Sequence, residues 1–339
     1  MFPRFLVRVY TRTRSSNAAA LTAEQPQWRH LWRIMLAAVL WGTVGVTTQS
    51  LYRLTATNPL SVGFFRLAIA APALGLGCSF VLGRRSLRIE PTDLARIALI
   101  GLMLAQYQAC FFAAIARVGV AVATLVTLCL APVIVAILSA VLLREHPTRR
   151  GLAALVCALV GIALVVGRGT ASSRAGADLW GVLLACASGG GYAVMALAGR
   201  SVARRYHPLQ INAVAFAVGA LVLLPLALTT GFVVSYSVNG WLLLTYLGLV
   251  PSALAYALFL SGMRSTPATV ASILTLLEPL TATILAAMLF GERLGALGLL
   301  GATLLLLAMI LLATGREGAP ERVKLRSQKQ GCTRCGRAG

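Results

Sequence analysis

The chain has 339 residues, of which 58% are hydrophobic and only 12% are charged. About a quarter of the residues in a soluble globular domain are charged, so this composition excludes a large soluble fold and indicates a surface that mostly faces lipid. The net charge of +21 does not indicate nucleic-acid binding, because the basic residues fall mainly in the gaps between apolar stretches. We therefore expect an all-α integral membrane protein with lipid as its main surroundings.

Residues 1–30 are polar and Arg-rich, and we interpret them as a disordered cytosolic arm, although transit peptides have a similar composition. Ten apolar stretches follow, each close to the ~20 residues that cross a bilayer as a helix. They lie at about Leu31–Tyr52, Pro59–Leu82, Ile97–Ala116, Val118–Leu143, Gly151–Gly167, Leu179–Gly199, Leu209–Thr229, Trp241–Met263, Thr269–Phe290 and Leu294–Gly315. Residues 316–339 form a basic tail.

The positions of Lys and Arg predict the orientation of these spans. With ten spans and the N-terminus in the cytosol, 24 of the 30 basic residues lie on the cytosolic side and five on the other. Cytosolic loops carry such an excess, so both termini are expected in the cytosol of a cell with an inner (plasma) membrane.

An internal repeat runs through the chain. With a shift of 147 residues, 101–151 aligns with 248–298 without a gap, and matched Arg, Pro, Glu and Gly are harder to reach by chance than matched Leu or Ala. The matches include Arg117 with Arg264, Pro132 with Pro279, and Glu145 with Glu292. We divide the chain into a first repeat (31–167), a Gly/Ser/Ala-rich linker (168–178) and a second repeat (179–315). Five spans per repeat would place the copies in inverted orientations, as in many secondary transporters.

The pattern in the two repeats resembles a known family. In the first repeat it comprises Trp41-Gly42, Asn58-Pro59, Phe65-Arg66-Leu67, Ala70, Arg117 to Ala121, Pro132, Leu143-Arg144-Glu145 and Gly151. In the second it comprises Pro267-Ala268, Leu277-Glu278-Pro279, Leu289-Phe290-Gly291-Glu292 and Gly298. With this doubled pattern, residues 31–315 resemble the EamA-like members of the drug/metabolite transporter (DMT) superfamily. The chain departs from that family at Ala131-Pro132, where a polar pair is often found, and at Arg144-Glu145 in place of Gly-Glu. The resemblance implies movement of small metabolites, commonly export.

Two ionisable residues lie well inside predicted spans, where a charge costs about 2.5–3.5 kcal/mol on insertion scales. Glu278 lies near the middle of the ninth span and precedes Pro279, which frees a backbone carbonyl one turn earlier. Glu278 could bind a proton or a substrate cation, could be a structural hydrogen-bonding group, or could lie at a misplaced span boundary. Arg66 could contact an anion in the pathway, or could reach the interface or helix carbonyls for structural reasons.

Further residues could line a substrate pathway, although a midspan aromatic residue more often serves packing. These are Trp41, Gln106, Tyr107, Gln108, Tyr192, Ser252 and Tyr256. Pro132 and Pro279 are predicted helix kinks. Gly189-Gly190-Gly191 could form a hinge in the sixth span or allow close helix packing, and packing is the reading we favour.

No cofactor or metal is predicted. The chain has no Walker motif. The single CxxC at Cys332 and Cys335 lacks a second ligand pair, so we interpret this motif as part of a solvated tail rather than as a zinc site. The three His residues are dispersed, which argues against a membrane enzyme. The favoured function is a secondary transporter that exports amino acids or related polar solutes. Hydrophobic drug efflux is the main alternative, and a receptor or scaffold without transport is a further one.

Overall fold

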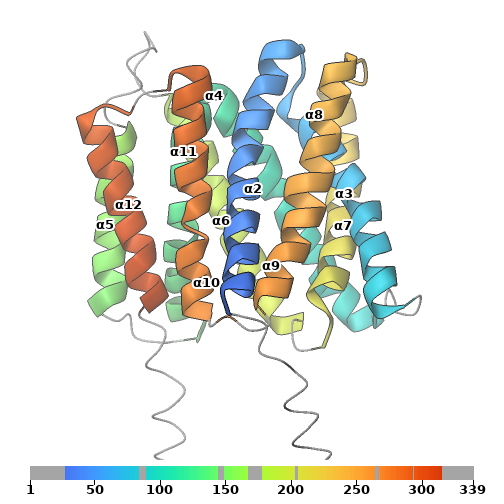
Figure 1. The fold of residues 1–339 in the computed structure, drawn as a ribbon, viewed down its shortest axis with the longest axis horizontal. Coiled ribbons are helices and arrows are strands. Elements are labelled where there is room, and N and C mark those ends of the chain that lie inside the picture. The colour runs from blue at the N-terminus through green and yellow to red at the C-terminus, as the bar shows by residue number, and fades with distance from the viewer. Residues whose placement is uncertain are drawn as a thin grey trace, which may run out of the picture.

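The computed structural model describes residues 27–83, 89–143, 149–166, 178–202, 205–263, 266, 268–292 and 294–314. These residues form helices and short connections and contain no β-strand. The helices are α2 (Gln27–Leu54), α3 (Pro59–Leu82), α4 (Pro91–Leu143), α5 (Arg149–Val166), α6 (Leu179–Val202), α7 (Pro208–Thr229), α8 (Val238–Gly248), the π-helical turn η2 (Leu249–Leu254), α9 (Ala255–Met263), α10 (Ala268–Leu274), α11 (Leu277–Phe290) and α12 (Ala296–Thr314). They stand side by side in one bundle, with α5 and α12 at one edge and α3 and α7 at the other (Figure 1).

Six helical stretches among the described residues are long and apolar enough to cross a membrane, and three shorter apolar helices accompany them. One of the six, Pro91–Val135, has 45 residues, which at ~1.5 Å per residue is roughly twice the ~30 Å of a hydrocarbon core. The chain is thus an all-helical, multi-pass membrane protein, while the count of ten spans stays a prediction.

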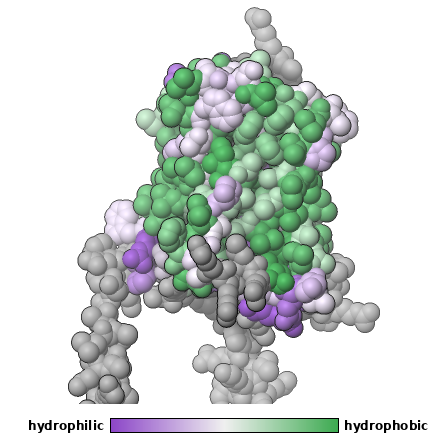
Figure 2. Space-filling model, turned by 90° about the vertical axis from the view of Figure 1, so that its right-hand side faces the viewer, coloured by the Kyte–Doolittle hydropathy of each residue, from purple (hydrophilic) through white to green (hydrophobic). Residues whose placement is uncertain are grey.

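Large apolar side chains point outward from the bundle, as expected for contact with lipid rather than water. Leu76 and Phe80 of α3 are 63% and 88% exposed, and Met288 of α11 is 76% exposed. Figure 2 shows one such face, apolar along its middle, with hydrophilic residues gathered near its lower end. Charged residues in the described part of the chain concentrate near helix ends and breaks, whereas Arg66 lies within α3.

The long helix α4 is interrupted at Gly119, whose φ of 80° and ψ of 174° are not helical. This break coincides with the predicted boundary between the third and fourth spans at Arg117. The Glu292 carboxylate accepts hydrogen bonds from the backbone N–H groups of Val120 (3.0 Å) and Ala121 (2.9 Å), which open the second half of α4. Glu292 therefore caps a helix of the other repeat, as a carboxylate at a helix N-terminus should. Its predicted counterpart Glu145 lies outside the described residues.

Corresponding connections of the two repeats lie at opposite ends of the bundle. Thr57, between α2 and α3, is 2.7 Å from the Tyr236 hydroxyl, which precedes α8. The matching residue of the second repeat, Tyr206, lies between α6 and α7 and contacts Asp93 at the start of α4. Thr57 precedes α3 and Asp93 follows it, so the two contacts lie at opposite ends of this helix.

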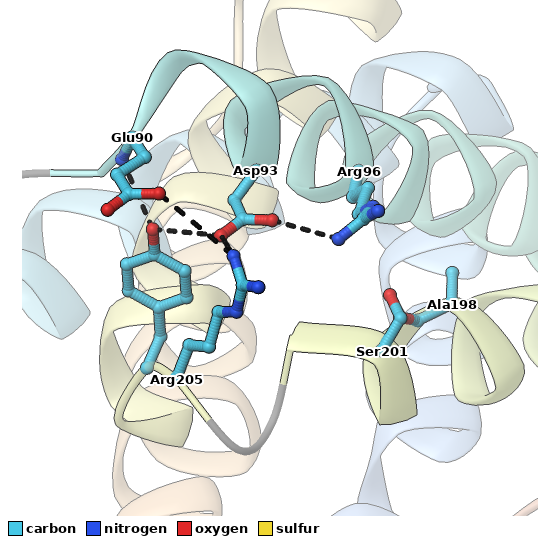
Figure 3. A network of polar contacts seen from close by, with 7 residues as sticks. Glu90, Asp93, Arg96, Ala198, Ser201 and Arg205 are labelled. Atoms are coloured by element: carbon cyan, nitrogen blue, oxygen red, sulfur yellow. Dashed lines mark hydrogen bonds and ion pairs between the residues drawn. The ribbon is translucent and has the colours of Figure 1, made fainter.

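The Asp93 contact is part of a polar cluster at one end of the bundle (Figure 3). The Asp93 carboxylate accepts hydrogen bonds from Arg96 Nη1 (3.0 Å), Arg205 Nη1 (3.0 Å) and the Tyr206 hydroxyl (3.2 Å). Its side chain is only 1% exposed, and a buried carboxylate is stable only with such partners. At the other end, Arg117 donates to Asp178 over 2.8 Å, and this hydrogen bond holds the pKa of the Asp178 carboxyl below its usual value.

Candidate functional site

Two glycines bring the central helices close enough to place the candidate residues side by side. A Cβ on Gly42 of α2 would lie 2.7 Å from the Glu278 carbonyl oxygen and 2.6 Å from Thr281 Cβ of α11. A Cβ on Gly248 of α8 would lie 2.6 Å from Ile69 Cβ and 3.3 Å from the Arg66 carbonyl oxygen of α3. Only glycine permits these approaches.

Arg66 is buried in the bundle, with 5% of the residue exposed. Its Nε donates to Ser252 Oγ over 2.9 Å, and its Nη1 donates to Gln108 Oε1 over 2.9 Å. The guanidinium carbon lies 5.8 Å from the centre of the Phe112 ring, which is within cation–π range. The contacts join α3, α4 and η2, so Arg66 does not reach out to the interface.

Ser252 owes its position to the π-helical turn η2. Its hydroxyl donates to the Leu247 carbonyl oxygen over 2.8 Å, five residues earlier in the chain. Wider turns of this kind often occur at functional sites. The hydroxyl oxygen is thereby oriented to accept from Arg66.

Glu278 lies where the ninth predicted span is interrupted. Helix α10 ends at Leu274 and α11 begins at Leu277, so Glu278 and Pro279 are in the first turn of α11. The Thr275 carbonyl, which Pro279 cannot bond, accepts instead from the Glu278 backbone N–H over 3.0 Å. Around Pro132, by contrast, α4 keeps helical backbone angles.

The Glu278 side chain is half-buried. It interacts electrostatically with Arg66 and with the phenol groups of Tyr107, Tyr192 and Tyr256. Within the described part of the chain, no side chain donates a hydrogen bond to its carboxylate. A cation, a carboxylate and three phenols thus share one neighbourhood at membrane depth, where irregular backbone and polar groups are tolerated only if buried in protein or lining a cavity.

Aromatic rings surround this group. Trp41 packs on Tyr256 and Phe259 with ring centroids 5.2 and 5.1 Å apart, and Tyr107 packs on Tyr192 at 5.5 Å. The buried Trp41 Nε1 has no hydrogen-bond partner among the described residues. An indole N–H usually finds a partner when buried, so this donor is an exception.

The structure brings together eight of the nine residues predicted from the sequence as pathway candidates, and separates one. Gln106 points toward α6, where its Nε2 donates to the Ala187 carbonyl oxygen (3.1 Å) and to Cys110 Sγ (3.3 Å). Sequence reasoning missed Phe259, although its position three residues after Tyr256 on one helix indicates a shared face. No group of three His, Cys, Asp or Glu residues suited to a metal occurs in the described ranges, and Cys332 and Cys335 lie outside them.

Ionisable residues enclosed within a bundle of membrane-spanning helices are typical of membrane transporters, where they mark substrate or ion pathways. The EamA-like transporter family matches residues 28–167 and again residues 179–314, so the chain belongs to that family and carries its repeat twice.

Three relatives illustrate the similarity. The chain is 32% identical to the uncharacterized transporter YwfM of Bacillus subtilis, over 86% of this chain and 94% of the relative. It is 27% identical to the uncharacterized inner membrane transporter YicL of Salmonella typhimurium, over 83% and 93%. It is 28% identical to a probable terminal-alkyne amino-acid exporter of Streptantibioticus cattleyicolor, over 83% and 92%. One solved crystal structure, 22% identical, superposes with a TM-score of 0.60 over 85% of this chain and shares its fold.

Proposed function

We propose that the chain is a secondary transporter that exports amino acids or related small polar metabolites across the inner membrane. The observation that carries this proposal is the enclosure of Arg66 and Glu278 near one another without a direct ion pair between them. An amino acid carries a carboxylate and an ammonium group that match the two charges. The similarity to a probable amino-acid exporter supports the same substrate class.

Hydrophobic drug efflux is the second candidate function. The aromatic rings of Trp41, Tyr256 and Phe259 favour it, since a drug site can be mostly apolar. The two charged residues argue against it, because an apolar ligand would leave both charges buried without partners.

The test of this function is a comparison of cells that lack the protein with cells that overproduce it. We expect overproduction to enrich the medium in particular amino acids or related solutes, and deletion to raise their concentration inside the cell. Purified protein in proteoliposomes should then exchange the same solutes. Unchanged metabolite profiles together with resistance to lipophilic drugs would favour efflux instead.

We further propose ten spans with both termini in the cytosol, supported by the excess of basic residues on that side. A reporter that works only in the cytosol should be active when fused after Gly315 or within Ser201–Tyr206. It should be inactive within Thr170–Gly176. Cytosolic activity at this last position would contradict the ten-span inverted arrangement.

A further inference from the structure

We infer that Arg66, held by Gln108 and Ser252, forms an anion subsite that binds the carboxylate of the transported solute. This inference rests on the proposed transport function and assigns the substrate a negatively charged group. Arg66 would contact the solute, while Gln108 and Ser252 are positioning residues that do not touch it.

The chemistry of its two partners shows that the Arg66 charge is held in place but not neutralised. Both acceptors, Ser252 Oγ and Gln108 Oε1, are uncharged groups at 2.9 Å. Buried Arg residues with a structural role are usually paired with a carboxylate, because an unpaired buried charge is costly. Glu278 is the acid that interacts with Arg66 electrostatically, yet no hydrogen bond joins the two among the described residues.

The remaining donors of Arg66 are arranged for a carboxylate. A guanidinium has five N–H donors in a planar fork. The bonds to Ser252 and Gln108 use one donor on Nε and one on Nη1. Three of the five donors, two on Nη2 and one on Nη1, take no part in these two bonds. A pair of donors on adjacent nitrogens of the fork is the geometry that binds a carboxylate with two parallel hydrogen bonds.

The groups around Arg66 fix the orientation of its guanidinium. Ser252 is anchored by its own bond to the Leu247 carbonyl oxygen, at 2.8 Å, so its hydroxyl proton is already used. Gly248 lets α8 approach α3 closely enough for Ser252 to meet the Arg66 side chain. The Phe112 ring lies beside the guanidinium plane, with 5.8 Å between its centre and the Arg66 guanidinium carbon. An arginine oriented on three sides pre-forms its binding geometry, which lowers the entropy cost of binding.

A structural role for Arg66 and an anion-binding role make opposite predictions at Gln108. In Gln108→Glu the side chain keeps its shape and gains a charge that neutralises Arg66. In Gln108→Met it keeps its approximate size and loses the acceptor without adding charge. If Arg66 is structural, Glu should be tolerated better than Met. If Arg66 binds the solute, Glu should be worse than Met for binding, although the Glu protein is the more stable of the two.

The experiment measures ligand-dependent thermal stabilisation of the purified full-length protein in detergent. The probes are L-phenylalanine and L-leucine, each compared with its amide, which lacks only the carboxylate charge. We expect the amino acids, and not the amides, to raise the Tm of the wild-type protein. Gln108→Glu should weaken this binding about tenfold or more, and Gln108→Met should weaken it less. Arg66→Lys should also lose binding, because an ammonium group lacks the planar fork of a guanidinium.

Three outcomes would overturn the inference. The amides could stabilise the wild-type protein as well as the amino acids do, or the Gln108→Glu variant could bind the amino acids as the wild type does. The third is that neither amino acid stabilises the wild-type protein. The Tm without ligand reports separately on folding, so a misfolded variant is recognised. Because binding is measured without flux, a protein that binds carboxylates but transports nothing would refute the proposed function and leave the subsite intact.

Discussion

Replacement of Glu278 by Gln is expected to abolish gradient-driven transport while leaving the protein folded. Glutamine keeps the shape of the side chain but cannot ionise, so it separates charge from packing. Glu278 is half-buried, lies where α10 and α11 are interrupted, and receives no hydrogen bond from the described side chains. A carboxyl group in such a place can take a proton from one side of the membrane and release it to the other.

The two modes of transport should respond differently in proteoliposomes. Flux driven by an imposed pH gradient should fall below about a tenth of the wild-type rate in Glu278→Gln, because no proton can be carried. Counterflow exchange of labelled for unlabelled solute needs no net proton movement and should persist. Equal gradient-driven flux in variant and wild type would reject the coupling role and leave Glu278 as a structural group beside Pro279.

Glu90→Gln provides a matched control. Glu90 is also an acid near a helix start, but its side chain is 72% exposed and lies 4.0 Å from the Arg205 guanidinium. This variant should transport at the wild-type rate under both conditions. The equivalent position in the first repeat is Ala131, so the proposed coupling group is single, and a second acid does not complicate the result.

Hydropathy and charge patterns were sufficient to predict the helical class and the position of most helices, and the motifs shared by the two repeats indicated the family. Arg117, a cation between two apolar stretches, marked the break that the structure places at Gly119. Glu292 follows the apolar run of the ninth predicted span, and its carboxylate accepts hydrogen bonds from the backbone N–H groups of Val120 and Ala121. These features follow from local sequence, because a span ends where polar residues interrupt an apolar run.

The contacts within the candidate site could not be predicted in the same way. The bond between Arg66 and Ser252 joins residues 186 positions apart and depends on the wider turn of η2. An apolar window cannot distinguish a π-helical turn from an α-helix. Hydropathy also does not predict the direction of a side chain. Gln106 and Gln108 are two positions apart on α4, yet Gln106 bonds to α6 and Gln108 bonds to Arg66.

Substitutions in the glycine run of α6 should separate packing from flexibility. The helix continues without interruption through Gly189, Gly190 and Gly191. A Cβ on Gly189 would lie 2.9 Å from the Thr127 carbonyl oxygen of α4, whereas a Cβ on Gly190 would meet nothing within 4 Å. Backbone cannot move aside as a flexible side chain can, so Gly189→Ala must push α6 away from α4.

We expect Gly189→Ala to destabilise the protein by about 1–3 kcal/mol, the usual cost of overpacking. Gly190→Ala should be neutral or stabilising by up to about 1 kcal/mol, because Ala favours the helix and meets no neighbour. The measurement is the Tm of each purified variant, combined with its counterflow rate. If the run served as a hinge, Gly190→Ala would stiffen it and slow exchange despite an unchanged or higher Tm. Close packing of α6 on α4 instead predicts wild-type exchange for Gly190→Ala and a lower Tm for Gly189→Ala.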